Sequence, residues 1–140
     1  MNVSISDNFE FFGRHLLASY TGCDPAALAD EAGLLEAMKS AVAASGATLL
    51  NCIEHSFKPS GMTAVMLLAE SHASIHTYPE HRACFVDLFT CGRGYSAQRF
   101  DAELRRYLRP SGVRRQIVVR RGQDEVGPAH NEDWPADWAA

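Results

Sequence analysis

Four short segments typical of strands follow one another between residues 47 and 90, and they constrain the fold more than any other feature of the chain. Each segment has the length of a strand, and the connections between them are too short to contain a helix. Strands joined in this way usually pair with their neighbours as antiparallel hairpins. We therefore expect a central antiparallel sheet with strands over Ala47–Phe57, Met62–Ala69, Ser74–Tyr78 and Cys84–Thr90.

Two helical segments flank these strands. The first begins at Asp24-Pro25, because aspartate can cap a helix and proline suits the first turn, and it continues to about Ser45-Gly46. The second covers about Ser96–Leu108 and is stopped by Pro110. Further strands are expected over Phe11–Tyr20 and Val113–Val119. This order predicts an α+β fold, a two-layer α/β sandwich with a mainly antiparallel sheet.

The composition is that of an ordinary globular domain. The 140 residues fit a single domain, residues 1–140, with 46% apolar and 21% charged residues. The apolar runs are too short to span a bilayer, and a net charge of -4 argues against nucleic acid, so we expect neither partner. Seven late arginines are interpreted as a solvated basic face or an anion patch: Arg105, Arg106, Arg109, Arg114, Arg115, Arg120 and Arg121.

Cysteine usage indicates a reducing compartment. The four cysteines are Cys23, Cys52, Cys84 and Cys91, and none lies in a C-x-x-C pair. No secretory signal is evident at the start of the chain. We therefore expect a cytoplasmic protein with free thiols.

Chemically reactive side chains are concentrated between residues 68 and 92. Ser71 follows an apolar run, His76 lies five residues further on, and Cys91 lies twenty residues after the serine. A hydroxyl, an imidazole and a thiol can act as nucleophile, proton carrier and proton donor. The segment resembles the self-cleavage region of the small prokaryotic S-adenosylmethionine decarboxylases. The resemblance is carried by Glu70-Ser71-His72, Ile75–Glu80 and Asp87–Gly92, and it extends over roughly Gly13–Val119.

Members of that family are made as proenzymes that cut themselves before a serine, which becomes a pyruvoyl group. The resemblance therefore implies cleavage between Glu70 and Ser71, giving chains 1–70 and 71–140, with a pyruvoyl cofactor generated from Ser71. A carbonyl beside an amide can accept the electron pair left when carbon dioxide departs from a bound amine. The resemblance also implies a homodimer of processed protomers with active sites near the subunit contact.

Three further roles follow from the resemblance. His76 is the base or proton carrier of self-cleavage, and an imidazole can both accept and donate a proton near neutral pH. Cys91 donates a proton to the substrate carbon after decarboxylation, and a thiol is mostly protonated at neutral pH. Thr63 stands where the family usually has a serine hydroxyl that supports processing, and its extra methyl group is a departure.

The residues expected to bind substrate are only partly typical of the family. By resemblance, Phe57 and Tyr78 stack on adenine, and Glu80 binds the ribose hydroxyls through its carboxylate. Tyr78 replaces a tryptophan, His81-Arg82 replaces an aromatic-glycine pair, and Ala64 stands where glycine is common. The resemblance thus implies decarboxylation of S-adenosylmethionine to the aminopropyl donor of spermidine (polyamine) synthesis. The alternative is the same chemistry on free L-ornithine or L-arginine.

Two alternatives of another class stay open. His72 and His76, with His81 and Cys84 nearby, are conceivable metal ligands, because strand residues four apart share a face. No third ligand lies at a recognised spacing, and the favoured reading includes no metal. A non-cleaving relative could also act as a regulatory subunit. A denaturing gel would separate these ideas, because only the enzyme gives two half-length fragments.

Overall fold

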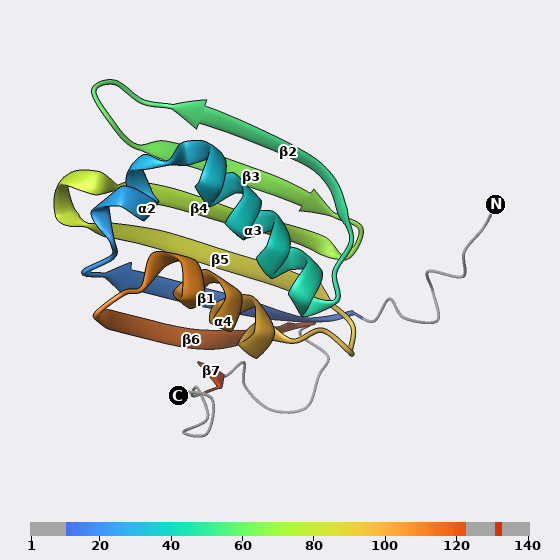
Figure 1. Cartoon of the computed structure of the whole chain (residues 1–140). Coiled ribbons are helices and arrows are strands. Elements are labelled where there is room, and N and C mark those ends of the chain that lie inside the picture. The colour runs from blue at the N-terminus through green and yellow to red at the C-terminus, as the bar shows by residue number, and fades with distance from the viewer. Residues whose placement is uncertain (1–10, 123–130, 133–140) are drawn as a thin grey trace.

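The computed structural model describes residues 11–122 and 131–132, and these residues form one sheet with its helices on one side (Figure 1). The strand order is β2-β3-β4-β5-β1-β6-β7, and every neighbouring pair is antiparallel. The strands are β1 (Phe12–Thr21), β2 (Leu49–Ser56), β3 (Met62–Leu68), β4 (Ser71–Tyr78), β5 (Ala83–Cys91), β6 (Gly112–Arg121) and β7 (Asn131–Glu132). The helices are α2 (Pro25–Ala29), α3 (Glu31–Ser45) and α4 (Ala97–Leu108), with a 3-10 turn η1 (Pro79–His81). The predicted α+β sandwich is confirmed.

The core lies between the sheet and the helices. Successive side chains of a strand point to opposite faces of a sheet. In β1, Leu16 and Tyr20 face the helices and are at most 1% exposed, whereas Leu17 on the other side is 41% exposed. Helices α3 and α4 contribute Met38 and Phe100, which are both fully buried in the same core. Removal of these apolar side chains from water is the main source of stability for the layer arrangement.

The face of the sheet away from the helices, here called the open face, carries several large apolar side chains. Their exposed fractions range from 41% to 70%. Cross-strand pairing puts them on the same side, since directly paired residues share a face. They are Leu17, Ile53, Val65, Leu67 and Phe85. Exposed apolar side chains gathered on one face of a sheet are typical of a docking surface.

The single helix expected from Asp24 to about Ser45-Gly46 is wrong in one respect, because the chain forms two helices, α2 and α3. The break falls at Asp30, whose ψ of 86° is not helical. The Asp30 carboxylate accepts a hydrogen bond from the backbone N–H of Gly33 at 2.9 Å, which caps α3. A favourable cap therefore compensates for the interruption, while the apolar spacing continues across it.

The strands agree with expectation except at their ends. The strand expected from Ser74 begins at Ser71, so Ser71 is the first residue of β4. The short strand β7 was not expected. The expectations of a loose start over residues 1–9 and of packing by Trp134 or Trp138 concern residues outside those that the structure describes. No helix among the described residues is long and apolar enough to cross a membrane.

A buried carboxylate joins α4 to the sheet. Asp101 is fully buried and accepts a hydrogen bond from the Tyr20 hydroxyl at 2.5 Å. It also accepts bonds from Arg105 Nε at 2.9 Å and Arg115 Nη1 at 2.5 Å. Burial raises the pKa of Tyr20, and the nearby charge of Asp101 raises it further, so the hydroxyl remains a donor. One side chain thereby links α4, β1 and β6.

Asp101→Ala should lower the free energy of unfolding by about 3–5 kcal/mol, because it takes a buried acceptor away from two cations. Urea unfolding followed by circular dichroism would measure the change. Glu103→Ala is the matched control, since Glu103 lies on the same helix and pairs with Arg106 at 3.0 Å on the surface. The control should lose less than about 1 kcal/mol. Equal losses in the two variants would contradict this account of Asp101.

Candidate active site

The Glu70–Ser71 peptide bond lies in the turn between β3 and β4, at one end of the sheet (Figure 1). The Glu70 carbonyl oxygen accepts a hydrogen bond from the backbone N–H of Cys91 at 3.0 Å. The Glu70 side chain accepts another from the N–H of Thr48 at 2.9 Å. Ser71 has a φ of 155°, a conformation that costs a residue other than glycine about 1–3 kcal/mol. The bond is therefore fixed on its carbonyl side and strained on its amide side.

The thiol of Cys91 belongs to the same end of the sheet. Cys91 is the last residue of β5, and its side chain is half-buried. Tyr95, in the loop before α4, interacts with both Glu70 and Cys91. Burial raises the pKa of Tyr95, and the charge and hydrogen bond of Glu70 raise it further, so its hydroxyl stays protonated. Cys91 and Tyr95 thus lie beside Glu70, the residue on the carbonyl side of the Glu70–Ser71 bond.

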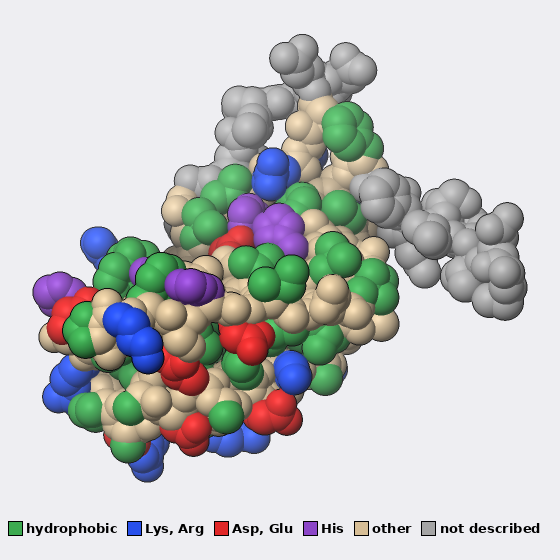
Figure 2. Space-filling view, turned by 90° about the horizontal axis from the view of Figure 1, so that it is seen from above, with side chains coloured by type: hydrophobic (Ala, Val, Ile, Leu, Met, Phe, Trp, Pro, Cys, Tyr) green, Lys and Arg blue, Asp and Glu red, His purple; other side chains and the backbone are tan. Residues whose placement is uncertain are grey.

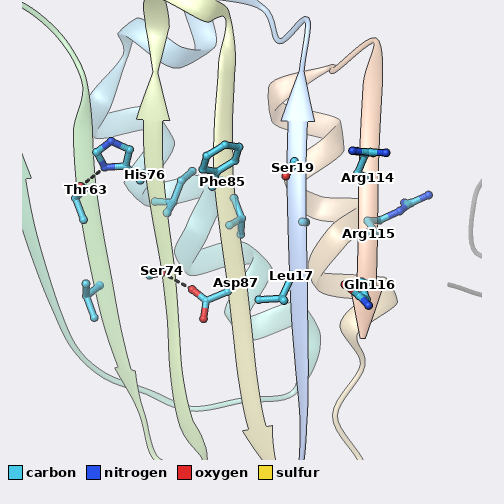
Figure 3. A pocket seen from close by; sticks show the side chains of 14 residues that line it. Leu17, Ser19, Thr63, Ser74, His76, Phe85, Asp87, Arg114, Arg115 and Gln116 are labelled. Atoms are coloured by element: carbon cyan, nitrogen blue, oxygen red, sulfur yellow. Dashed lines mark hydrogen bonds between the residues drawn. The ribbon is translucent and has the colours of Figure 1, made fainter. Parts of the chain in front are cut away.

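A second group of expected site residues lies on the open face. Thr63 and His76 are cross-strand partners, and Thr63 Oγ1 is hydrogen-bonded to His76 Nδ1 (Figure 3). The His76 ring centroid is 5.8 Å from that of Phe57 and 4.6 Å from that of Tyr78. We call Phe57, Thr63, His76 and Tyr78 the aromatic cluster. Glu80 follows this cluster on η1, where its side chain is exposed.

Ser71 and His76 do not lie close together within the chain. They are five residues apart in one strand, so their side chains leave opposite faces of the sheet. Five residues of extended chain span about 16 Å. The turn between β3 and β4 and the turn η1 also lie at opposite ends of the sheet (Figure 1). The expected site residues therefore form two groups, one around Ser71 and Cys91 and one around His76.

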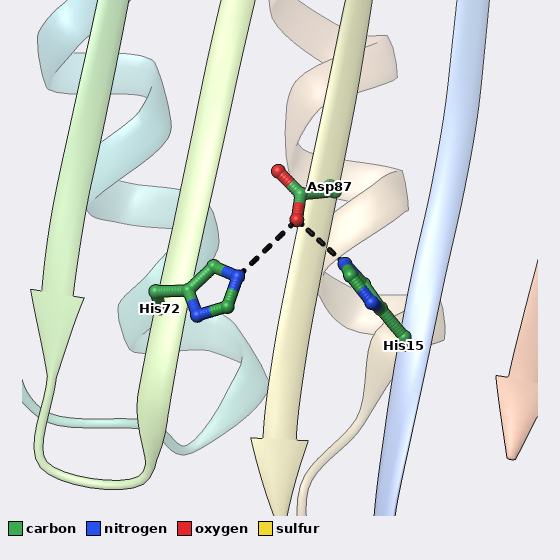
Figure 4. A group of neighbouring side chains, drawn as sticks. All are labelled: His15, His72 and Asp87. Carbon is green, nitrogen blue, oxygen red and sulfur yellow. Dashed lines mark hydrogen bonds and ion pairs between the residues drawn. The ribbon is translucent and has the colours of Figure 1, made fainter. Parts of the chain in front are cut away.

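A third polar group on the open face consists of His15, His72 and Asp87 (Figure 4). Asp87 Oδ2 lies 2.6 Å from His15 Nε2 and 3.5 Å from His72 Nε2. The Ser74 hydroxyl donates to the other carboxylate oxygen. Burial alone would raise the pKa of Asp87, but hydrogen bonds from His15 and Ser74 and the charge of both histidines hold it below its ordinary value. Asp87 is therefore an ionised acceptor at neutral pH.

The open face is hollowed between these groups. The hollow has a volume of about 670 Å³, which is in the range of small-molecule sites. It extends from Thr63 and His76 on one side to Arg114 and Gln116 on the other, with Asp87 between them (Figure 3). Figure 2 shows histidine side chains exposed among apolar ones. Such a surface offers groups for stacking as well as groups for hydrogen bonding.

The residues of the metal alternative do not gather. His72 and His76 share the open face, as their spacing predicts, but His81 is exposed on η1. Cys84 is buried in the core. Among the described residues, a different set could hold a metal ion. The ligand atoms of His15, His72 and Asp87 all lie within 4.8 Å of one another.

Sequence reasoning passed over His15, Asp87 and Tyr95. Asp87 stands inside one of the quoted motifs, but its contacts depend on the pairing of β5 with β4 and β1. His15 is 72 residues away from Asp87 along the chain, and no local pattern connects the two. Only the sheet register could have revealed the contact between His15 and Asp87.

Comparison with known proteins agrees with the geometry. The family model for S-adenosylmethionine decarboxylase matches residues 14–121. An S-adenosylmethionine decarboxylase proenzyme of Parasynechococcus marenigrum is 50% identical over 97 residues, which cover 69% of this chain and 76% of that protein. The proenzyme of Methanococcus maripaludis strain C5 is 39% identical over 114 residues, covering 81% and 93% of the two chains.

A solved structure gives the same result. The crystal structure of the adenosylmethionine decarboxylase from Aquifex aeolicus VF5 superimposes with a TM-score of 0.74 at 33% identity. The superposition covers 86% of this chain and 99% of that one. Family model, relatives and fold thus agree over the same part of the chain. The chain belongs to the S-adenosylmethionine decarboxylase family.

Proposed function

We propose that this protein is a self-processing, pyruvoyl-dependent decarboxylase of S-adenosylmethionine. The chain is cut between Glu70 and Ser71 into residues 1–70 and 71–140, and Ser71 becomes the pyruvoyl group. The observation that carries the proposal is the hydrogen bond from the Cys91 N–H to the Glu70 carbonyl. Relatives that are named proenzymes support the cleavage.

The contact at Glu70 favours attack on its carbonyl carbon. A hydrogen-bond donor at the oxygen stabilises the negative charge that develops there when Ser71 Oγ adds to the carbon. Because nucleophile and target belong to adjacent residues, no encounter entropy is lost. The unfavourable φ of Ser71 supports the same reading, since backbone strain at a reacting bond can be relieved when the bond breaks.

The surroundings of Ser71 fit a small keto group at the start of β4. Ser71 is half-buried, and Cys91 on the neighbouring strand presents a thiol at the same end of the sheet. When formed, the pyruvoyl group supplies the electron sink that decarboxylation of an amine needs. Cys91 Sγ then holds the proton that is delivered to the substrate carbon. Tyr95 keeps a protonated hydroxyl beside Glu70 and Cys91.

The aromatic cluster is suited to bind the nucleoside of S-adenosylmethionine. Phe57 and Tyr78 offer ring faces for a base, and aromatic rings also attract a sulfonium cation. Phe57 is 42% exposed and therefore accessible to a ligand. Glu80, exposed beyond the cluster, can accept two hydrogen bonds from ribose hydroxyls. A free basic amino acid has no base to stack on these rings and no ribose hydroxyls to donate to Glu80, which favours S-adenosylmethionine over L-ornithine or L-arginine.

We further propose that the working form is a homodimer joined through the open face. Ser71 and His76 are about 16 Å apart in one protomer, so self-processing assisted by His76 needs His76 of the partner subunit. A two-fold axis places the same patch of both subunits in contact and can set opposite ends of two sheets against each other. The exposed apolar side chains of the open face support this contact.

The free thiols of all four cysteines support a cytoplasmic setting.

Freshly purified protein should give two fragments of 70 residues by denaturing gel and mass spectrometry, and it should release carbon dioxide from S-adenosylmethionine. Ser71→Ala should remain full-length and inactive, because it has no hydroxyl to attack Glu70. L-Ornithine and L-arginine are assayed in parallel. An unbroken wild-type chain would refute the self-processing proposal, and turnover of a basic amino acid alone would refute the substrate.

Cys91→Ala should still be cut but should lose about 10²–10⁴-fold in decarboxylation rate. The reason is that the backbone N–H of Cys91 contacts the Glu70 carbonyl, whereas its thiol serves the later proton transfer. Fragment yield and carbon dioxide release are measured on the same sample. Cys52→Ala, a half-buried cysteine of β2, is the control and should match wild type. Undiminished turnover by Cys91→Ala would remove the proton-donor role.

Val65→Glu should produce a monomer with little decarboxylase activity, because it puts a charge in the middle of the open face, where Val65 is 47% exposed. Size-exclusion chromatography with light scattering gives the mass. Ser40→Glu adds the same charge to an exposed position of α3, on the other side of the molecule, and should leave mass and activity unchanged. A wild-type protein that is monomeric and active would contradict the dimer.

A further inference from the structure

We propose that His72, held by Asp87, is the base that removes the proton from the Ser71 hydroxyl in the first step of self-cleavage. This inference rests on the proposed function and adds a catalytic residue to it. It concerns the exchange of the Glu70–Ser71 peptide for an ester, before any pyruvoyl group exists. His76 keeps the later role in proton transfer that the proposed function gives it.

The contacts form a connected path from the hydroxyl to a carboxylate. Ser71 Oγ lies 3.3 Å from His72 Nδ1. On the other side of the ring, His72 Nε2 faces Asp87 Oδ2 at 3.5 Å (Figure 4). A nucleophile, an imidazole and an orienting carboxylate in this order are the arrangement that activates hydroxyl groups in enzymes, and their contacts are often longer before the reactive complex forms.

Asp87 determines which nitrogen of His72 is free to act. A negative charge beside Nε2 favours the tautomer with its proton on Nε2, which leaves the lone pair of Nδ1 facing the hydroxyl. Asp87 is itself fixed by His15 at 2.6 Å and by the Ser74 hydroxyl. The Phe89 ring contacts both imidazoles, with centroid distances of 5.2 Å to His15 and 5.7 Å to His72. Asp87 and Phe89 therefore orient the base, and His15 and Ser74 hold Asp87 in place.

The bond changes balance without a co-reactant. Ser71 Oγ bonds to the carbonyl carbon of Glu70 while its proton moves to His72 Nδ1. The resulting oxyanion is stabilised by the Cys91 N–H, 3.0 Å from the Glu70 oxygen. The Glu70–Ser71 C–N bond then breaks, and His72 returns the proton to the leaving nitrogen. The product is an ester with a free amino group on Ser71.

No other imidazole that the structure describes contacts Ser71 within the protomer. His76 is about 16 Å away along the strand, and its Nδ1 is engaged with Thr63. His15 contacts Asp87 rather than Ser71. His72 is thus the histidine placed to start the reaction in a single chain.

The test is a time course of cleavage of the full chain made by cell-free synthesis, with and without hydroxylamine. Hydroxylamine splits an ester at Glu70 and so reports the first step separately, and the chain has no Asn-Gly bond that would react with it. The variants are His72→Gln and Asp87→Asn. The matched control is His81→Gln, an exposed histidine outside the described contacts of Ser71 and Asp87. Intact mass identifies each fragment, and circular dichroism checks folding.

We expect His72→Gln to lose at least about 100-fold in cleavage rate and to remain uncut in hydroxylamine, because no ester forms. Asp87→Asn should slow cleavage at least about tenfold with its fold retained, and His81→Gln should match wild type. If His72→Gln does not fold, the Asp87→Asn variant provides the test. Cleavage of Asp87→Asn at the wild-type rate would then overturn the inference.

Three results would overturn the role of His72. One is cleavage of His72→Gln at the wild-type rate. Another is an uncut His72→Gln chain that hydroxylamine does split, since His72 would then act after the ester forms. The third is loss of wild-type cleavage in EDTA with recovery on addition of Zn²⁺, since the three side chains would then serve a metal ion. An uncut wild-type chain would instead contradict the proposed function itself.

Discussion

The two-residue alternation of the strands is the constraint on which the rest of the structure depends. It gives one face of the sheet to the helices and leaves the other face with apolar and histidine side chains. The buried face supplies stability, with Asp101 linking α4 to two strands. The open face carries His15, His72, His76 and Asp87, whereas Ser71 belongs to the face on the helix side.

The same rule divides the functional residues among themselves. Residues Ser71 and His76 belong to one short motif, yet an odd spacing in a strand turns them to opposite faces. An even spacing keeps His72, Ser74 and His76 together. Proximity in sequence is therefore a poor guide to contact here, and this is the reason that we propose a second subunit as the source of His76.

Much of the fold could be predicted from the chain because the signals were local. The hairpin strands, the start of a helix near Ser96 and its stop after Leu108 each depend on neighbouring residues. The break at Asp30 was missed, since apolar spacing continues across it and only the cap bond to Gly33 reveals it. The motif around Ser71 indicated which bond to expect as the cleavage site, whereas the contacts of Asp87 required strand register that no local pattern specifies.

The strand order has a consequence for the chain once it is divided at Glu70. Strands β1, β2 and β3 would belong to the first piece, and β4, β5, β6 and β7 to the second. Because the order is β2-β3-β4-β5-β1-β6-β7, three seams of the sheet, β3 with β4, β5 with β1, and β1 with β6, would join one piece to the other. The two pieces would be interleaved, so strand pairing and the shared core would hold them together after the backbone is cut.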